Sequence, residues 1–434
     1  MRFDPIYCIF IFCYNGARGA HLNETEEKVL PARRWWVLVG LALTYASTNG
    51  ILLHTLPIMY PHLMETFGWS QSQVTLPATV FFAIGAITTP PAGVLLDRFS
   101  PRLIIIAGLL GIIVALFGYG MMNQLWQLVV IYAVFAVSLS LCGLVSNMLV
   151  LSRWFIELRG RATGILLMSS SAGGAVFPLL LGFFLVSSDW RVAMQMMAVV
   201  VVFCALVPII LFVRDRPVGP AEVGDRDVDA SNGSTVAKAL REPRFYLVAL
   251  ATGVLWFTIV GVVQHQSIYL AGDMEIDKQL LPLIFSTFFA CSVIGKLLFG
   301  WLSDHFDKTM MMLASMVMLA IGLLLLRNVT LAGNISLFGY VIVAGAGFAG
   351  VFTMIQLLFA NFYAGGSYGK ILAILMLVDT LAGALGIRVL AYIRETTGSY
   401  LGGIDLMIGL LILAFVCILA ACRTAVPGIP LERG

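Results

Sequence analysis

Two ten-residue segments, GVLLDRFSPR at residues 93–102 and GWLSDHFDKT at residues 300–309, decide the predicted fold of this chain. Each begins with a glycine, carries an aspartate four residues later, and closes a long apolar run. The second segment begins 207 positions after the first, and the same interval separates Phe155 from Phe362, each of which follows a later apolar run. This repeat predicts that the chain is a duplication of one structural unit.

Long apolar runs make up most of the sequence. Of the 434 residues, 60% are hydrophobic and 11% are charged, whereas about 25% of residues are charged in a typical soluble protein. A run of about 20 apolar residues crosses the ~30 Å hydrocarbon core of a bilayer as a helix. Six runs precede and six follow a polar stretch, near residues 36–60, 72–96, 103–122, 125–151, 162–186, 191–213, 243–270, 279–303, 310–326, 334–360, 369–392 and 401–422.

We therefore predict an all-α membrane protein with twelve transmembrane helices in two six-helix, pseudo-symmetric halves. Residues 35–213 and 243–422 are the expected six-helix bundles. Residues 214–242, which include RDRPVGPAEVGDRDVDASNGS, have the composition of a linker. Residues 1–34 and 423–434 are the expected N-terminal segment and C-terminal tail.

The positions of the basic residues predict the orientation in the membrane. An even number of spans places both termini on one side, and the cytoplasmic side is normally richer in Lys and Arg. With both termini inside, 20 of the 26 basic residues fall in cytoplasmic segments. We expect an integral protein of the plasma membrane, or of the inner membrane in a bacterium, with cytoplasmic termini and linker.

The repeated segments resemble the loop between helices 2 and 3 of the major facilitator superfamily and its weaker second copy. Within that superfamily, the chain is similar to the branch of monocarboxylate porters and oxalate/formate antiporters. The similar segments are YPHLMETFGWSQSQ at 60–73, RWFIELRGRATGI at 153–165 and TTGSY at 396–400. The resemblance implies the major facilitator fold and a secondary transporter, and the porters of this branch carry a basic residue in helix 8 at the position of Lys296.

Lys296 and Asp379 are charged residues inside apolar runs. A charge within a span costs roughly 2.5–3.5 kcal/mol on insertion scales, which makes both residues candidates for function. At 1.5 Å per residue, Lys296 lies ~10 Å and Asp379 ~16 Å above the cytoplasmic end, so the two could meet. We interpret Lys296 as an anion site and Asp379 as its proton-coupling partner. The alternative is a structural ion pair that does not touch the substrate.

Five uncharged polar residues inside the spans are further candidates for substrate binding. Such side chains could hydrogen-bond a substrate, but they also join helices to one another in lipid. A histidine can titrate near neutral pH, although a lone buried histidine is more often a packing residue. The candidates are Asn49, His54, Asn147, Gln264 and Gln356.

The repeated segments also contain a candidate conformational latch. A carboxylate near a helix end can bridge to a neighbouring helix start or to a basic side chain, and a glycine one turn earlier permits close backbone approach. The alternative is an ordinary solvated loop charge. The latch residues are Gly93, Asp97, Arg98, Gly300 and Asp304.

The leading hypothesis is a secondary active transporter of a small organic anion, with a monocarboxylate favoured, that works by proton symport or anion exchange with alternating access. A carrier of a neutral or cationic solute and a non-transporting membrane sensor on the same fold are the alternatives. The expected partners are the anionic substrate, protons or a counter-anion, and the lipid bilayer.

Because the chain has no HExxH, GxSxG or phosphate-binding Gly-Lys-Ser/Thr motif, we expect no catalytic residues, cofactor or metal. The formal charge of +3 gives no reason to expect nucleic acid.

The orientation gives the first testable prediction. Single cysteines at Arg98, Arg153 and Lys308 should react with an impermeant thiol reagent only after the membrane is opened. Cysteines at Lys278 and Arg394 should react in intact cells. External labelling at position 308 would reverse the proposed orientation.

Overall fold

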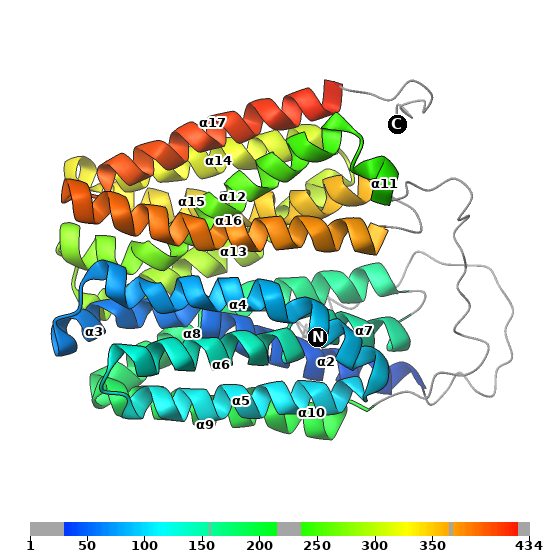
Figure 1. Cartoon of the computed structure of the whole chain (residues 1–434), viewed down its shortest axis with the longest axis horizontal. Coiled ribbons are helices and arrows are strands. Elements are labelled where there is room, and N and C mark those ends of the chain that lie inside the picture. The colour runs from blue at the N-terminus through cyan, green and yellow to red at the C-terminus, as the bar shows by residue number, and fades with distance from the viewer. Residues whose placement is uncertain (1–29, 156–157, 215–235, 364–367, 424–434) are drawn as a thin grey trace, which may run out of the picture.

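The computed structural model describes residues 30–155, 158–214, 236–363 and 368–423, and within these ranges the regular structure is helical. The described residues form twelve helices that are long and apolar enough to cross a membrane. Six of them belong to the first half of the chain and six to the second (Figure 1). The predicted fold class is therefore confirmed.

The first half contains three spans that are single helices and three with interrupted helical geometry, which are spans 1, 4 and 6. Span 1 begins as α2 (Leu30–Asn49), continues through a π-helical segment (Gly50–Thr55) and a 3₁₀ turn (Leu56–Met59), and ends as α3 (Tyr60–Phe67). The remaining elements are α4 (Gln71–Arg98), α5 (Pro101–Met121), α6 (Leu125–Cys142), α7 (Leu144–Trp154), α8 (Arg159–Ser187), α9 (Trp190–Val201) and α10 (Val207–Phe212). Span 4 consists of α6 and α7, and in span 6 a π-helical segment (Val202–Leu206) separates α9 from α10.

The second half begins, within the described residues, with the short helix α11 (Val236–Ala239). Its six spans are built mainly from single helices, although the first continues through a π-helical segment (Tyr269–Asp273) and the second begins with a 3₁₀ turn (Lys278–Leu280). They are α12 (Pro243–Ile268), α13 (Leu281–Ser303), α14 (Lys308–Arg327), α15 (Val329–Phe362), α16 (Tyr368–Thr397) and α17 (Leu401–Arg423).

Helix contacts repeat between the halves. In the first half α4 packs on α6, α5 on α9 and α2 on α8, and in the second half α13 packs on α15, α14 on α17 and α12 on α16. The halves meet where α4 contacts α16 and where α8 contacts α13 (Figure 1). When each helix is replaced by its counterpart in the other half, the first of these contacts becomes the second. The 207-residue repeat in the sequence is thus a structural duplication.

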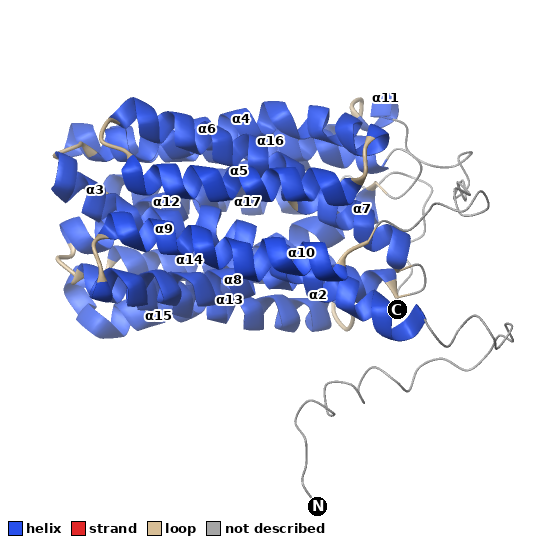
Figure 2. Cartoon of the chain, turned by 90° about the horizontal axis from the view of Figure 1, so that it is seen from below, coloured by secondary structure: helices blue, strands red, loops and turns tan. Residues whose placement is uncertain are grey.

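Both described chain ends lie at one end of the bundle, which also holds α7 and α11 (Figures 1 and 2). We call this the linker end and the opposite one the far end. At the linker end Phe155 packs against Trp35 with ring centroids 5.5 Å apart, and Arg244 lies 5.1 Å from the ring of Phe362. Each repeated phenylalanine therefore contacts the start of the first span in its own half.

Large apolar side chains cover the outside of the bundle. Phe183, Val186 and Ile335 are 69%, 76% and 83% exposed. Such a surface would be unfavourable in water, and it is the surface that a lipid bilayer requires.

The closest backbone approach in the first half joins span 1 to α8. A Cβ atom added to Gly173 would lie 2.0 Å from the carbonyl oxygen of Ala46, and one added to Gly50 would lie 2.5 Å from the carbonyl carbon of Gly173. Only glycine fits at these two positions without moving a backbone.

Replacement of Gly173 by alanine should destabilise the protein by about 1–3 kcal/mol, because the new methyl group overlaps backbone atoms that cannot rotate away. Thermal unfolding in detergent would measure the loss. Gly164→Ala is the matched control, since it lies in the same helix and its Cβ would meet nothing within 4 Å. Equal melting temperatures for the two variants would contradict the packing argument.

Candidate functional site: a cavity between the halves

A cavity of about 280 Å³ lies between the two halves. Its walls come from span 1, α4, α6, α7 and α8 on one side and from α12, α13, α15 and α16 on the other. Five of the predicted site residues line it, which are Asn49, His54, Gln264, Lys296 and Gln356. The cavity is therefore the place where the sequence-derived candidates from both halves come together.

Lys296 extends from α13 across the interface to α8. Its Nζ donates hydrogen bonds to the carbonyl oxygen of Leu167 at 3.0 Å and to Ser170 Oγ at 3.1 Å, and it lies 4.6 Å from the centre of the Phe352 ring. The side chain is only 9% exposed. Among the ion pairs of the described residues, none includes Lys296. The ammonium is thus buried, partly hydrogen-bonded and without a neutralising carboxylate.

The predicted meeting of Lys296 and Asp379 is wrong for this structure. Asp379 lies on α16 and is 6% exposed, but it faces Thr252 of α12 within its own half and does not line the cavity. Its Oδ1 is buried with no hydrogen-bond partner among the described residues. Depth along the membrane placed the two residues at similar levels, but the rotation of α16 turns Asp379 toward α12.

His54 lies in the π-helical segment of span 1. Its ring stacks on Phe289 of α13 with centroids 3.8 Å apart, so it also joins the two halves. The Nδ1 atom is buried and has no partner among the described residues, and the side chain is 8% exposed at the cavity wall. The sequence did not reveal this stacking, because nothing in the spacing of the two residues brings them together.

Gln264 contributes to both the cavity wall and the closure of the interface. Its Oε1 accepts a hydrogen bond of 2.7 Å from the hydroxyl of Tyr60, which belongs to α3 in the other half. The amide nitrogen is left for other partners. Gln356 is half-buried and occupies the wall one helical turn beyond Phe352.

Asn147 is a correction to the predicted site. Its Nδ2 donates to the carbonyl oxygens of Cys142 at 2.8 Å and Gly143 at 2.7 Å, where span 4 is interrupted between α6 and α7. The side chain is fully buried and does not line the cavity. Asn147 therefore replaces the backbone partners that the break removes, as polar residues do within spans.

The latch residues lie near the linker-end termini of α4 and α13. A Cβ atom at Gly93 or at Gly300 would meet nothing within 4 Å, so neither glycine is in close backbone contact here. Arg98 and Asp304 are exposed, and the side chain of Asp97 lies outside the described residues. The latch stays a prediction about a state in which these helix ends approach their neighbours.

Polar contacts close the interface between the halves at the far end. Arg388, which the sequence placed near a helix end, donates across the interface from α16 to the start of α4. The contacts are Tyr60 with Gln264 at 2.7 Å, Ser267 Oγ with the carbonyl oxygen of Pro57 at 2.5 Å, Arg388 Nη1 with the carbonyl oxygen of Ser72 at 3.2 Å, and the ion pair of Lys278 with Glu65.

Comparisons with known proteins agree with this geometry. Residues 36–269 and 266–433 each match the Major Facilitator Superfamily. The chain belongs to the Major Facilitator Superfamily. It is therefore an integral membrane protein and a transporter of that superfamily, whose members are generally not enzymes and act on small molecules.

Individual relatives are distant. The chain is 24% identical over 306 residues to the membrane sensor protein UhpC of Salmonella typhimurium, covering 64% of this chain and 67% of that protein. It is 22% identical over 404 residues to the MFS-type transporter YcxA of Bacillus subtilis, covering 91% and 94%. A bacterial homologue of the human lysosomal transporter Spinster, solved in an inward-facing and unoccupied conformation, superimposes with a TM-score of 0.71 at 18% identity over 91% of this chain and 98% of that one.

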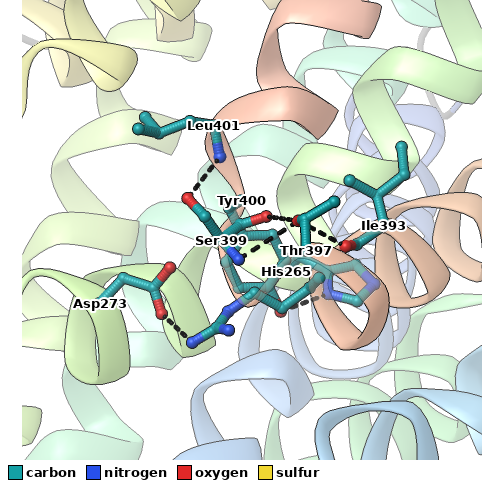
Figure 3. A network of polar contacts seen from close by, with 8 residues as sticks. His265, Asp273, Ile393, Thr397, Ser399, Tyr400 and Leu401 are labelled. Carbon is teal, nitrogen blue, oxygen red and sulfur yellow. Dashed lines mark hydrogen bonds and ion pairs between the residues drawn. The ribbon is translucent and has the colours of Figure 1, made fainter.

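The TTGSY segment of this superfamily member contains the last two residues of α16 and the turn that leads into α17 (Figure 3). Gly398 adopts φ +72°, a left-handed conformation that favours glycine at a helix C-terminus. Ser399 Oγ accepts a hydrogen bond of 3.2 Å from the backbone N–H of Leu401. This turn places the side chain of Tyr400 back into the far end of the second half, where it is 1% exposed.

Tyr400 meets a buried histidine that the sequence analysis did not select. Its hydroxyl lies 2.9 Å from His265 Nδ1, and His265 Nε2 lies 3.0 Å from the carbonyl oxygen of Ile387 (Figure 3). Because a carbonyl only accepts, Nε2 carries the hydrogen and Nδ1 accepts from Tyr400. Arg394, paired with Asp273 at 2.7 Å, covers the tyrosine ring. These contacts fasten α12, α16 and α17 together.

Tyr400→Phe should lower stability by about 1–3 kcal/mol, because it leaves the buried Nδ1 of His265 without its donor. Tyr392→Phe is the matched control, since Tyr392 lies on α16 and is 66% exposed. Thermal unfolding of the purified protein in detergent measures both. A melting temperature for Tyr400→Phe that equals the control would leave the hydroxyl without a structural role.

Proposed function

We propose that this transporter moves a small organic anion, with monocarboxylates as the favoured class, by proton symport or anion exchange. The buried ammonium of Lys296 is the observation that carries the proposal. It lines the cavity between the halves, and none of the ion pairs among the described residues neutralises it. A buried charge without a neutralising partner is costly, so a bound anion would supply the opposite charge.

The charge of the cavity favours a single carboxylate over a dianion. Lys296 is the one Lys, Arg, Asp or Glu among the described residues that line the cavity. One ammonium can neutralise one carboxylate, whereas a second anionic group would remain desolvated and unpaired. A cationic substrate would be repelled by the same ammonium, and the structural pair with Asp379 that would have shielded it is not formed.

The contacts of Lys296 suggest how binding is linked to movement. Its hydrogen bonds to Leu167 and Ser170 join α13 of the second half to α8 of the first. A carboxylate that reaches the ammonium competes with these acceptors and weakens the connection between the halves. In alternating access, each half then moves as a unit while the far-end contacts open and the linker end closes.

Lys296→Gln should abolish uptake of carboxylates into proteoliposomes, while Lys296→Arg should retain part of it because the charge survives in a planar group. Lys370→Gln is the matched control, since Lys370 is exposed at the start of α16. Uptake of labelled acids from a panel gives the readout. Wild-type rates in Lys296→Gln would overturn the anion site.

Asp379 remains the proposed proton-coupling residue, now acting at a distance from Lys296. Its buried Oδ1 has no hydrogen-bond partner among the described residues, and it lies beside Met376 and Thr380, which line the cavity wall. A proton on this carboxyl removes a charge from within α16, so loading and release of the proton can favour different positions of that helix.

Asp379→Asn should remove the response of uptake to a pH gradient but leave exchange of one anion for another. Asp405→Asn is the matched control, because Asp405 lies in an exposed ion pair with Arg327 and such pairs contribute little. Proteoliposomes with and without an imposed gradient separate the two activities. Gradient-driven uptake by Asp379→Asn at the wild-type rate would exclude the residue from coupling.

A second candidate function is a membrane sensor that binds the anion without transporting it. The similarity to UhpC, which is named a membrane sensor protein, is the observation that favours it. Binding of a carboxylate to the purified protein, without uptake or exchange in proteoliposomes under any gradient, would support the sensor. Exchange at rates above those of protein-free liposomes would exclude it.

A further inference from the structure

Six aromatic side chains line the cavity that contains Lys296. Rings reach the cavity from span 1 and α4 in the first half and from α12 and α15 in the second. They are Tyr45, Phe81, Phe82, Trp256, Phe348 and Phe352. Phe348 and Phe352 are one turn apart on α15 and therefore share the helix face that meets the cavity.

The rings are arranged as two walls in different halves. In the second half, the centroids of Trp256 and Phe352 lie 6.1 Å apart with ring planes at 68°, and Phe352 is the ring beneath the Lys296 ammonium. In the first half, Phe81 and Phe82 of α4 lie 5.3 Å apart at 86°. Both pairs are edge-to-face, which is one of the arrangements that an aromatic guest can adopt against a ring.

The cavity wall also contains polar groups, among them Asn49, Ser140, Ser170 and Thr380. His54 and Gln264 lie toward the far end, and Gln356 follows Phe352 toward the linker end. A two- or three-carbon acid bound to Lys296 would leave much of the 280 Å³ cavity to water against aromatic walls. A ring attached to the carboxylate would displace that water and contact apolar surface instead.

We infer that the substrate is an aryl monocarboxylate, in which the carboxylate accepts from Lys296 and the ring lies between the Trp256–Phe352 wall and the Phe81–Phe82 wall. This inference rests on the proposed function and names its substrate class. Closure of the halves brings the two walls together around the ring. The ring therefore contributes to recognition by both halves at once, while the carboxylate sets its orientation.

The test compares binding and uptake of phenylacetate, cyclohexylacetate, lactate and acetate by the intact protein. Phenylacetate and cyclohexylacetate share a carboxylate and a six-membered ring, so they isolate aromatic character from size. Contacts between aromatic rings predict that phenylacetate binds roughly 2- to 10-fold more tightly than cyclohexylacetate, and both should exceed lactate and acetate.

Variants of the second-half wall test the assignment of the ring site. Phe352→Leu and Trp256→Leu should each reduce the preference for phenylacetate over cyclohexylacetate, which a general loss of stability would not do. Phe183→Leu is the matched control, because Phe183 is 69% exposed on the outside of α8. If one wall variant fails to fold, the other variant and the wild-type panel still decide the question.

The outcomes separate this inference from the proposed function. Transport of lactate or acetate with no preference for phenylacetate would overturn the aryl assignment and leave the anion carrier intact. Equal affinity for phenylacetate and cyclohexylacetate would also overturn it. Failure of every carboxylate to bind or move would overturn the proposed function, and the aryl assignment with it.

Discussion

The hydrogen bonds of one buried ammonium connect the two halves of this transporter at the level of its cavity. Lys296 belongs to α13, and both acceptors, the carbonyl oxygen of Leu167 and Ser170 Oγ, belong to α8. A charge at this depth must keep polar partners in every conformation, because losing them would expose it to apolar surroundings. Movement of α13 relative to α8 therefore requires a replacement acceptor, and an anion in the cavity is the natural one.

The fold could be predicted almost completely from the sequence, because the bilayer imposes one dominant constraint. Each span must satisfy its backbone internally and present apolar side chains outward, so its length and composition are visible in the sequence. The repeated segments beginning at Gly93 and Gly300 then gave the correspondence between halves. Lys296 was visible for the same physical reason, since a charge stands out in an apolar run.

The details of the site depend on helix rotation and on contacts between distant segments, which a sequence pattern does not contain. Asp379 was expected near Lys296 because depth is predictable from residue number, whereas the direction of a side chain around α16 is not. Asn147 resembled a substrate ligand because the break of span 4 at Gly143 is not evident in the apolar pattern. Phe348 and Phe352 have the spacing of ordinary core residues in the sequence. Their position in the cavity wall, which the sequence does not show, is what distinguishes them from packing residues.

The π-helical segment Gly50–Thr55 determines which side chains of span 1 line the cavity. In a regular α-helix, Asn49 and His54 would point about 140° apart, because five residues correspond to 1.4 turns. Here the Leu56 N–H bonds to the carbonyl oxygen of Ile51, and Thr55 Oγ1 bonds to that of Gly50 at 2.7 Å, so the turn is wider by one residue. Both side chains consequently line the cavity. The position of His54 is thus fixed by the number of residues in one turn, and a homologous helix one residue shorter would present a different side chain to the substrate while keeping the same composition.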